Sequence, residues 1–139
     1  MTNNIFICSP YRGHGDTPEE VKKDRLCNIK LAQYACRYAL GGGYLPFAPH
    51  LYFPQFLHDS DPDERTLGLH VGRTWLEQCD ELWVIGYRIS EGMKAEIMMA
   101  EKLGIPIKHY VWKRTPEERL LDAFLRPEIQ YHEMDWKSL

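Results

Sequence analysis

The chain has 139 residues, a length that suits one domain built around one core. Hydrophobic residues make up 44% and charged residues 27%, which is ordinary for a soluble globular protein. The formal net charge of −3 excludes the basic footprint of proteins that bind nucleic acid polymers or anionic membranes. The longest apolar runs are of strand length, so no segment is predicted to span a membrane.

The amino terminus and the cysteines indicate a cytoplasmic protein. Residues 1–4 lead directly into an apolar run and lack the basic start of a signal peptide. Cys8, Cys27, Cys36 and Cys79 form no Cys-x-x-Cys pair, and each lies in an apolar segment. We therefore expect buried free thiols in a reducing compartment, and no structural zinc site.

The first apolar run, Ile5–Cys8, predicts a buried strand. The loop at 9–16 follows it and contains a proline, two glycines and Arg12. Accessible backbone N–H groups and a guanidinium suit such a loop to binding an anion. The same glycines also fit an ordinary strand-to-helix turn, so both interpretations stay open here.

A helix start follows the loop. Thr17 is its predicted cap, Pro18 takes the first helical position, and Glu20 completes a capping box. Three glycines at 41–43 are predicted to end the helix. The apolar residues expected along one helix face are Leu26, Ile29, Ala32, Cys36 and Leu40.

A short second strand is predicted at 44–49, with prolines that limit its ladder. The aromatic stretch 50–57 and the polar stretch 58–65 then form a long connection. This connection is interpreted either as a lid or pocket wall for a planar base, or as a loop packed on the core or a partner subunit. Its polar part and the following residues contain possible metal ligands without the spacing of a defined site: His58, Asp59, Asp61 and His70.

The second half alternates helices and strands. A helix is predicted at 66–79, a strand at 82–86, a helix in the stretch 89–104 with Gly92 at its start, and a strand at 105–111. Thr115 begins a final short helix that ends near Pro127. The tail, with Tyr131 and Trp136, is expected to dock on the body or on a neighbour.

This order predicts an α/β fold: a doubly wound three-layer sandwich with a mostly parallel, Rossmann- or flavodoxin-like sheet. A single domain spans 1–139, with its core at about 4–111 and a C-terminal helix and tail at 115–139. The loops at 9–15, 46–50 and 86–92 would meet in the crevice at the carboxyl ends of the strands.

Several motifs together resemble one family. They are Phe6–Gly13, Cys79–Val84, Ser90-Glu91-Gly92-Met93-x-x-Glu96, Leu103–Pro106 and Pro46-x-x-Pro49-His50-Leu51. Over residues 4–111 the chain resembles the nucleoside 2-deoxyribosyltransferase-like superfamily, and within it the small uncharacterised members from bacteria and phages. The Arg-Gly in the first loop is also similar to the deoxynucleoside 5′-monophosphate N-glycosidase branch.

The resemblance implies a catalytic pair. Glu96 matches the family's nucleophile, a carboxylate that attacks the anomeric carbon and forms a covalent glycosyl-enzyme. Tyr11 matches a strand-end tyrosine that orients this carboxylate by a hydrogen bond. From spacing alone, Glu96 is also explained as an acidic residue favoured by the dipole near a helix start.

The resemblance and the predicted crevice also give a substrate-binding set for a nucleoside or nucleotide: Ser9, Arg12, Gly13, His50, Ser90, Gly92 and Met93. Arg12 and Gly13 are the candidates for a 5′-phosphate, while Ser90 and Gly92 are candidates for sugar hydroxyls or phosphate. Met93 also belongs to an apolar helix stripe, which indicates core packing. No metal and no organic cofactor are implied.

Two positions depart from the family. Gly72, beside Arg73, replaces an aspartate, and Ser90 replaces a frequent acidic residue. The missing aspartates would assist base protonation and sugar binding, which leaves hydrolysis or a changed substrate open. Asp80 matches a family position but is interpreted as a helix-to-strand turn residue.

Two other functions remain. One is a non-catalytic nucleotide-binding protein, a sensor or sponge that keeps the pocket without turnover. The other is an interaction module whose aromatic segment, Tyr52–Phe56, forms an oligomer interface. The interaction-module function is compatible with catalysis, because the resemblance implies homo-oligomers, dimers or larger, in which a neighbour completes the site.

Overall fold

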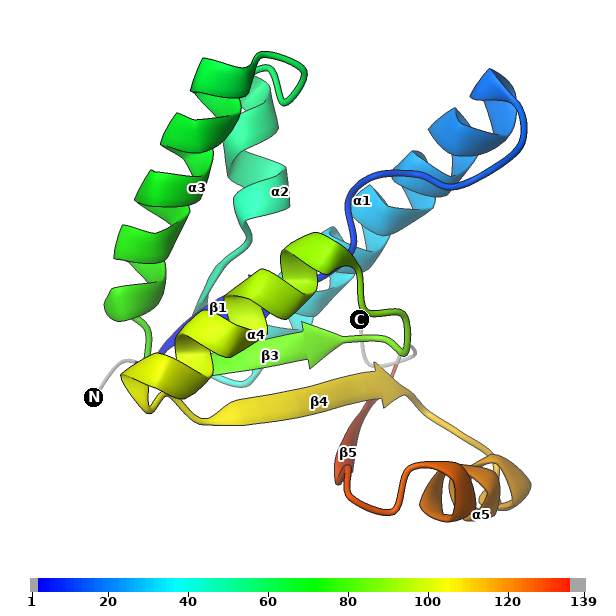
Figure 1. Ribbon diagram of the computed structural model, residues 1–139. Coiled ribbons are helices and arrows are strands. Elements are labelled where there is room, and N and C mark those ends of the chain that lie inside the picture. Colours follow the sequence, from blue (N-terminus) through cyan, green and yellow to red (C-terminus); the bar gives the residue numbers. More distant parts are fainter. Residues whose placement is uncertain (1–2, 136–139) are drawn as a thin grey trace.

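A computed structural model describes residues 3–135. Figure 1 shows a central sheet with helices on both faces and α5 beyond one edge. The elements are β1 (Asn3–Cys8), α1 (Pro18–Gly41), β2 (Tyr44–Phe47), α2 (Pro49–Tyr52), the short 3₁₀ helix η1 (Phe53–Gln55), α3 (Pro62–Glu77), β3 (Glu81–Ile85), α4 (Glu91–Leu103), β4 (Ile107–Trp112), α5 (Pro116–Leu125) and β5 (Tyr131–Met134).

The sheet has the strand order β2-β1-β3-β4-β5, and every neighbouring pair is parallel. The α/β three-layer fold expected from the sequence is therefore confirmed. The chain moves outward from β1 to β2 on one side and from β3 to β5 on the other. This places the topological switch point, where such sheets bind ligands, between β1 and β3.

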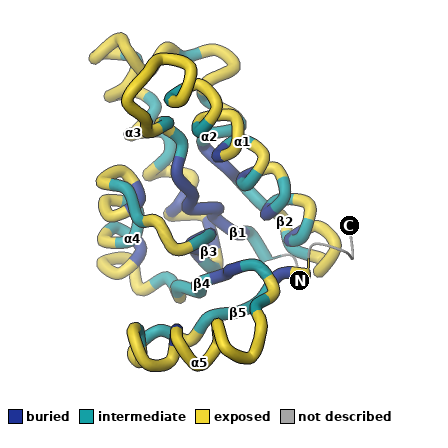
Figure 2. Tube along the Cα trace, turned by 90° about the vertical axis from the view of Figure 1, so that its right-hand side faces the viewer, coloured by how far each residue is buried: buried dark blue, intermediate teal, exposed yellow. Residues whose placement is uncertain are grey.

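Alternating side chains of the strands fill two cores, one on each face of the sheet. Ile5, Ile7 and Trp83 pack on the α1 side with Ala35 and Ala39. On the other face, a second core contains Phe6, Cys8, Leu82, Val84, Leu76, Cys79, Met93 and Ala100. Figure 2 shows the dark, buried strands between α1 and α4. Cys8, the last residue of β1, thus lies under α4.

The predicted helix caps Thr17 and Thr115 are confirmed, and one predicted capping box is wrong. Thr17 caps α1 by accepting a hydrogen bond from the Glu20 N–H, but Glu20 Oε2 accepts from the Asp16 N–H and does not complete the box. Thr115 caps α5 in a capping box. Ser90 caps α4, so that helix begins at Glu91. Gly104 ends α4 with φ of 71°, a left-handed conformation that glycine adopts without strain.

Three segments differ from the prediction. Helix α3 begins at Pro62 under an Asp61 cap, four residues before the predicted start, because the Asp-Pro pair is itself a helix start. Within the predicted connection, α2 and η1 form. The tail contributes β5 as a fifth strand on β4, so it docks on the body, whereas Trp136 lies outside the described residues.

The buried face of α1 is rotated from the prediction. Leu26 and Leu40 are 51% and 58% exposed, and the buried residues are Asn28, Ala32, Ala35 and Ala39. Small side chains let the helix approach the sheet closely, so alanines occupy the contact. Cys27 is exposed on this helix, so the expectation of a buried thiol is wrong there, while Cys8 and Cys79 are buried and Cys36 is half-buried. Between residues 3 and 135, no helix is both long and apolar enough to cross a membrane.

Candidate active site

Glu96 lies in the second turn of α4, above the end of β1. Its side chain is partly buried, and its carboxyl oxygen Oε1 is enclosed without a hydrogen-bond partner. Burial raises the pKa of Glu96 to about 8, and the neighbouring Cys8 thiol offsets part of that rise. An ionisable group perturbed in this way at a switch point is a candidate for chemistry.

Ser9 and His50 lie beside the end of β1. Ser9 is fully buried, and its Oγ has no hydrogen-bond partner. Burial lowers the pKa of His50, in α2, to about 4, and the nearby Ser9 backbone offsets part of this shift. The imidazole is therefore neutral at physiological pH. The structure thus brings a second unpaired oxygen, the Ser9 hydroxyl, and a neutral imidazole to the loop that follows β1.

Tyr11 packs on His50. The two rings stack with centroids 5.0 Å apart and planes 20° apart. Among residues 3–135, no hydrogen bond joins the Tyr11 hydroxyl to Glu96. The orienting role of Tyr11 stays a prediction, and the interaction that fixes its ring in this arrangement is the stack on His50.

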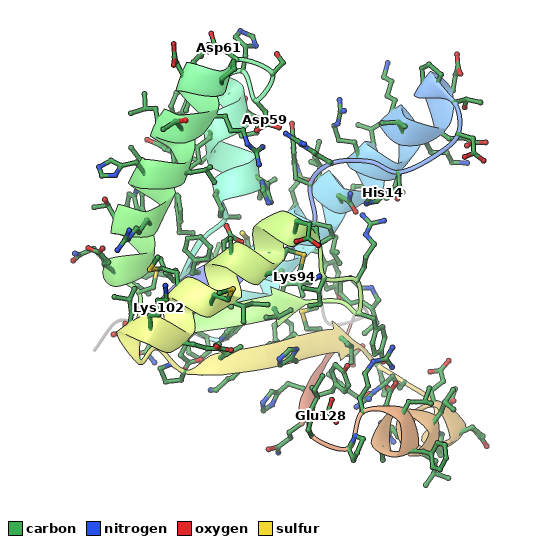
Figure 3. The ribbon with its side chains drawn as sticks, viewed as in Figure 1. His14, Asp59, Asp61, Lys94, Lys102 and Glu128 are labelled. Atoms are coloured by element: carbon green, nitrogen blue, oxygen red, sulfur yellow. The ribbon has the colours of Figure 1, made fainter. Side chains whose placement is uncertain are left out.

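Arg12 is paired with a carboxylate. Its Nε and Nη2 donate to Asp59 Oδ2 at 3.0 and 2.7 Å, and Arg65 Nη1 donates to Asp59 Oδ1 at 2.8 Å. Burial would raise the pKa of Asp59, but the two arginines outweigh it and lower that pKa. Figure 3 labels Asp59 on the segment leading into α3. The pair is largely exposed, so it contributes about 0–1 kcal/mol, and a competing anion could separate it.

Three residues that the sequence did not predict hold the loop at 9–16 in place by hydrogen bonds. Asn28 Nδ2 donates to the carbonyl oxygens of Tyr11 and Arg12 at 3.2 and 3.3 Å. Arg88, before α4, donates to Asn28 Oδ1 and to Asp24 Oδ2, and Asp24 also accepts from the backbone N–H of His14. The detectable signal was Asn28, a polar residue on a helix face that otherwise buries alanines.

The start of α4 holds the remaining predicted residues. Ser90 Oγ accepts from the Met93 N–H at 3.2 Å, so the hydroxyl serves as a helix cap. Met93 is buried in the core, as its apolar spacing indicates. Gly92 is exposed in the first turn. Helix capping therefore explains Ser90, and core packing explains Met93, without any ligand.

The two site glycines differ in what surrounds them. A Cβ on Gly13 would lie 1.9 Å from the Val21 carbonyl oxygen, whereas a Cβ on Gly92 would meet nothing closer than Ser90 Oγ at 4.0 Å. We expect Gly13→Ala to lower the free energy of unfolding by roughly 2–4 kcal/mol, because backbone must move. We expect Gly92→Ala to be neutral or to stabilise by up to about 1 kcal/mol. Urea denaturation measures both, and equal destabilisation by the two would contradict the assignment.

Two family positions lie away from the site. Asp80 precedes β3, and its Oδ2 accepts from the Asn4 N–H at 2.8 Å, at the amino ends of the strands. Its interpretation as a turn residue fits this position. A Cβ added to Gly72, in α3, would lie 3.7 Å from the Phe53 ring, so this position faces the aromatic segment.

Two surface hollows lie away from the predicted catalytic pair. One of about 600 Å³ lies between α4, β4 and the start of β5, and one of about 220 Å³ lies beside β2 and Trp75. Within the described part of the chain, no three His, Cys, Asp or Glu side chains gather as a metal would require. The case for the site therefore rests on its buried polar atoms.

Comparisons with known proteins support the fold. A family model described as a domain of unknown function, DUF7768, matches residues 3–110. A 2-deoxyribosyltransferase from Bacillus psychrosaccharolyticus superposes with a TM-score of 0.64 at 15% identity, over 94% of this chain and 86% of that chain. No curated protein matches the sequence.

Two further solved structures are similar over most of their length. The Clostridium botulinum CMP N-glycosidase BcmB has a TM-score of 0.46 at 16% identity, over 96% of this chain and 88% of that chain. A conserved protein from Enterococcus faecalis V583 has a TM-score of 0.48 at 17% identity, over 95% and 80%. At these identities the likeness concerns the fold.

Proposed function

Because the chain belongs to the family of the domain of unknown function DUF7768, we propose a function from its own site. The protein cleaves the N-glycosidic bond of a (deoxy)nucleoside or nucleoside 5′-monophosphate, with Glu96 as nucleophile. The observation that carries this proposal is Glu96 Oε1, buried without a partner. Such an atom costs roughly 1–3 kcal/mol of folding free energy, and a reaction that needs it free explains its retention.

In the proposed reaction, the Glu96 carboxylate attacks the anomeric carbon while the bond to the base breaks. The bonding electrons leave with the base nitrogen, which takes a proton from water or a nearby acid. Water then attacks the same carbon, releases the sugar and restores the carboxylate. A second base in place of water would make the reaction a transfer. The Bacillus protein of the same fold is described as a 2-deoxyribosyltransferase, which is consistent with either outcome.

The ionised form of Glu96 is the reactive one, and its raised pKa makes this form the minor one at neutral pH. A hydrogen bond from the Tyr11 hydroxyl to the carboxylate would favour ionisation and orient the attack. In the present arrangement the Tyr11 ring stacks on His50. We assign Tyr11 this role in the substrate complex.

The proposed substrate contacts come from the loops around β1. Ser9 Oγ is a buried hydroxyl free to bond a ligand, and neutral His50 offers a stacking or hydrogen-bonding surface. Arg12, with Gly13, would bind a 5′-phosphate by exchanging Asp59 for the phosphate. Ser90 and Gly92 would lie against the sugar or phosphate at the start of α4.

A panel of ribonucleosides, deoxynucleosides and their 5′-monophosphates tests the function. Free base is followed by chromatography, with and without a second base as acceptor. We expect base release from at least one member, and release that needs the second base would identify transfer. Binding of a nucleotide without release would favour the non-catalytic sensor or sponge, and neither binding nor release would contradict both functions.

The proposal includes self-association. Tyr52 and Phe56 are exposed on the aromatic segment, and α5 exposes a row of large apolar side chains, Leu120, Leu121, Phe124 and Leu125. Exposed apolar groups of this density favour an interface between copies. Light scattering at micromolar concentration tests it, and a monomeric mass would contradict it. A cytoplasmic location and membership of the small bacterial and phage subgroup stay predictions.

A further inference from the structure

Two side chains of α1, one helical turn apart, hold the backbone of the loop that follows β1. Asp24 Oδ2 accepts a hydrogen bond from the His14 N–H at 2.8 Å. Asn28 Nδ2 donates to the carbonyl oxygens of Tyr11 and Arg12 at 3.2 and 3.3 Å. Positions four residues apart lie on the same face of a helix. One face of α1 therefore provides both an acceptor and a donor for the loop backbone.

Arg88 contacts the same two side chains from the loop that follows β3. Its Nη1 donates to Asp24 Oδ2 at 3.2 Å, and its Nη2 donates to Asn28 Oδ1 at 3.1 Å. Arg88 precedes Ser90, the cap of α4, by two residues, and α4 carries the proposed nucleophile Glu96. Since β1 and β3 are neighbours in the sheet, these hydrogen bonds join the two loops on either side of the switch point.

An amide suits position 28 because two different demands meet there. The carbonyl oxygens of the first loop need a donor, and the Arg88 guanidinium needs an acceptor. A side-chain amide supplies both from one planar group, whereas an ionised carboxylate only accepts and an alkyl group does neither. The same demands fix which way the Asn28 amide points, with Nδ2 toward the loop and Oδ1 toward Arg88.

Packing does not explain Asn28. Its side chain is only 6% exposed, and it continues the buried stripe of α1 that otherwise consists of Ala32, Ala35 and Ala39. A buried amide loses its hydrogen bonds to water, which is costly unless protein groups replace them. Here the loop carbonyls and Arg88 replace them. The hydrogen bonds between the loops are therefore what an asparagine provides at this position and an alanine would not.

We propose that Asn28 is a positioning residue, which fixes the loop carrying Tyr11 and Arg12 to the loop before α4 through Arg88. Its catalytic meaning rests on the function proposed above, in which Tyr11 orients Glu96 and Arg12 binds a 5′-phosphate. A first loop that is free to shift would hold the Tyr11 hydroxyl within reach of Glu96 for less of the time. Displacements of about 1 Å at a reacting centre reduce rates by as much as ~10²-fold.

The first test needs no turnover. Asn28→Asp keeps the size of the side chain and an acceptor for Arg88, but it removes the donor to the loop carbonyls. NMR measures exchange of the His14 N–H with solvent, and we expect this exchange to be ~10-fold faster in Asn28→Asp. Asn4→Asp is the matched control, because Asn4 Nδ2 donates to the Gln78 carbonyl oxygen at the amino ends of the strands. It should leave His14 exchange unchanged.

The second test uses base release from the substrate that the unchanged protein cleaves. Asn28→Asp is expected to lower kcat by ~10-fold with a smaller change in KM, and Asn4→Asp to leave both unchanged. Arg88 is 42% exposed, so Arg88→Gln breaks the same link without altering the core. It should lower kcat to a similar extent. The double variant should lose no more than the weaker of the two single variants retains, because both act through one network.

The outcomes separate the link from the reaction. Unchanged His14 exchange in Asn28→Asp and in Arg88→Gln, or an equal effect of Asn4→Asp, would overturn the proposal. Faster exchange with an unchanged kcat would also overturn it, because the hydrogen bonds would then serve the fold alone. Losses in kcat that multiply in the double variant would mean that Asn28 does not act through Arg88. Faster exchange in a protein that releases no base would keep the link and remove the proposed function.

Discussion

Glu96→Gln is expected to reduce base release by roughly 10³-fold or more, because the amide cannot form the glycosyl ester. Glutamine has nearly the same shape as glutamate, so the core beneath α4 should stay intact. Steady-state kinetics on whichever nucleoside the unchanged protein cleaves gives the measurement. Substrate binding, followed by calorimetry, should survive the substitution.

A matched control lies on the same helix. Glu101, also in α4, is exposed and lies outside the predicted site, so Glu101→Gln removes one carboxylate without touching the end of β1. We expect its kcat and KM to equal those of the unchanged protein. Undiminished release by Glu96→Gln would exclude Glu96 as nucleophile, and equal losses in both variants would indicate a general effect of charge.

Glu96→Gln is also expected to change how stability depends on pH. The pKa of Glu96 is raised in the folded state from 4.5 to about 8 by burial, so between these values the folded chain holds a proton that the unfolded chain has released. Stability of the unchanged protein therefore falls as pH rises from about 4.5 to 8. The neutral amide carries no such dependence.

The expected change in unfolding free energy is large for one side chain. The difference in unfolding free energy between the variant and the unchanged protein should shift in the variant's favour by about 4 kcal/mol between pH 4.5 and pH 9. Any constant cost of placing an amide in the site cancels in this comparison. Urea denaturation of both proteins at pH 4.5, 7 and 9 gives the values. Parallel stability curves across this range would mean that Glu96 is not enclosed in the folded chain.

Helix-capping residues and apolar spacing in the sequence predicted most of the fold. Thr17 and Thr115 are capping residues whose chemistry acts within one turn, so neighbouring residues suffice to recognise them. The fifth strand was missed because Tyr131–Met134 is short and polar. Its strand structure comes from pairing with β4, a non-local contact. The buried face of α1 was misjudged because leucines carry the hydropathy signal while alanines make the close contact.

The sequence order predicted where several candidate residues lie, but not the contacts between them. Sequence order placed Ser9, His50 and Glu96 near the strand ends, as parallel sheets require. The Arg12–Asp59 pair and the Arg88–Asn28 hydrogen bond join positions far apart in the chain, and no spacing rule reports such pairs. Ser90 was predicted as a ligand contact although its Ser-x-x pattern before an apolar run is also that of a helix cap.

The central claim is that Glu96 is the nucleophile and carries the sugar in a covalent intermediate. Trapping that intermediate is the most direct test. A 2′-fluoro analogue of the cleaved nucleoside slows breakdown of the intermediate, because fluorine destabilises positive charge on the sugar. Intact-protein mass spectrometry should then find one added fluoroglycosyl group, and peptide analysis should place it on Glu96. A protein that releases base without a mass increase, or that carries the group on another residue, would contradict the account.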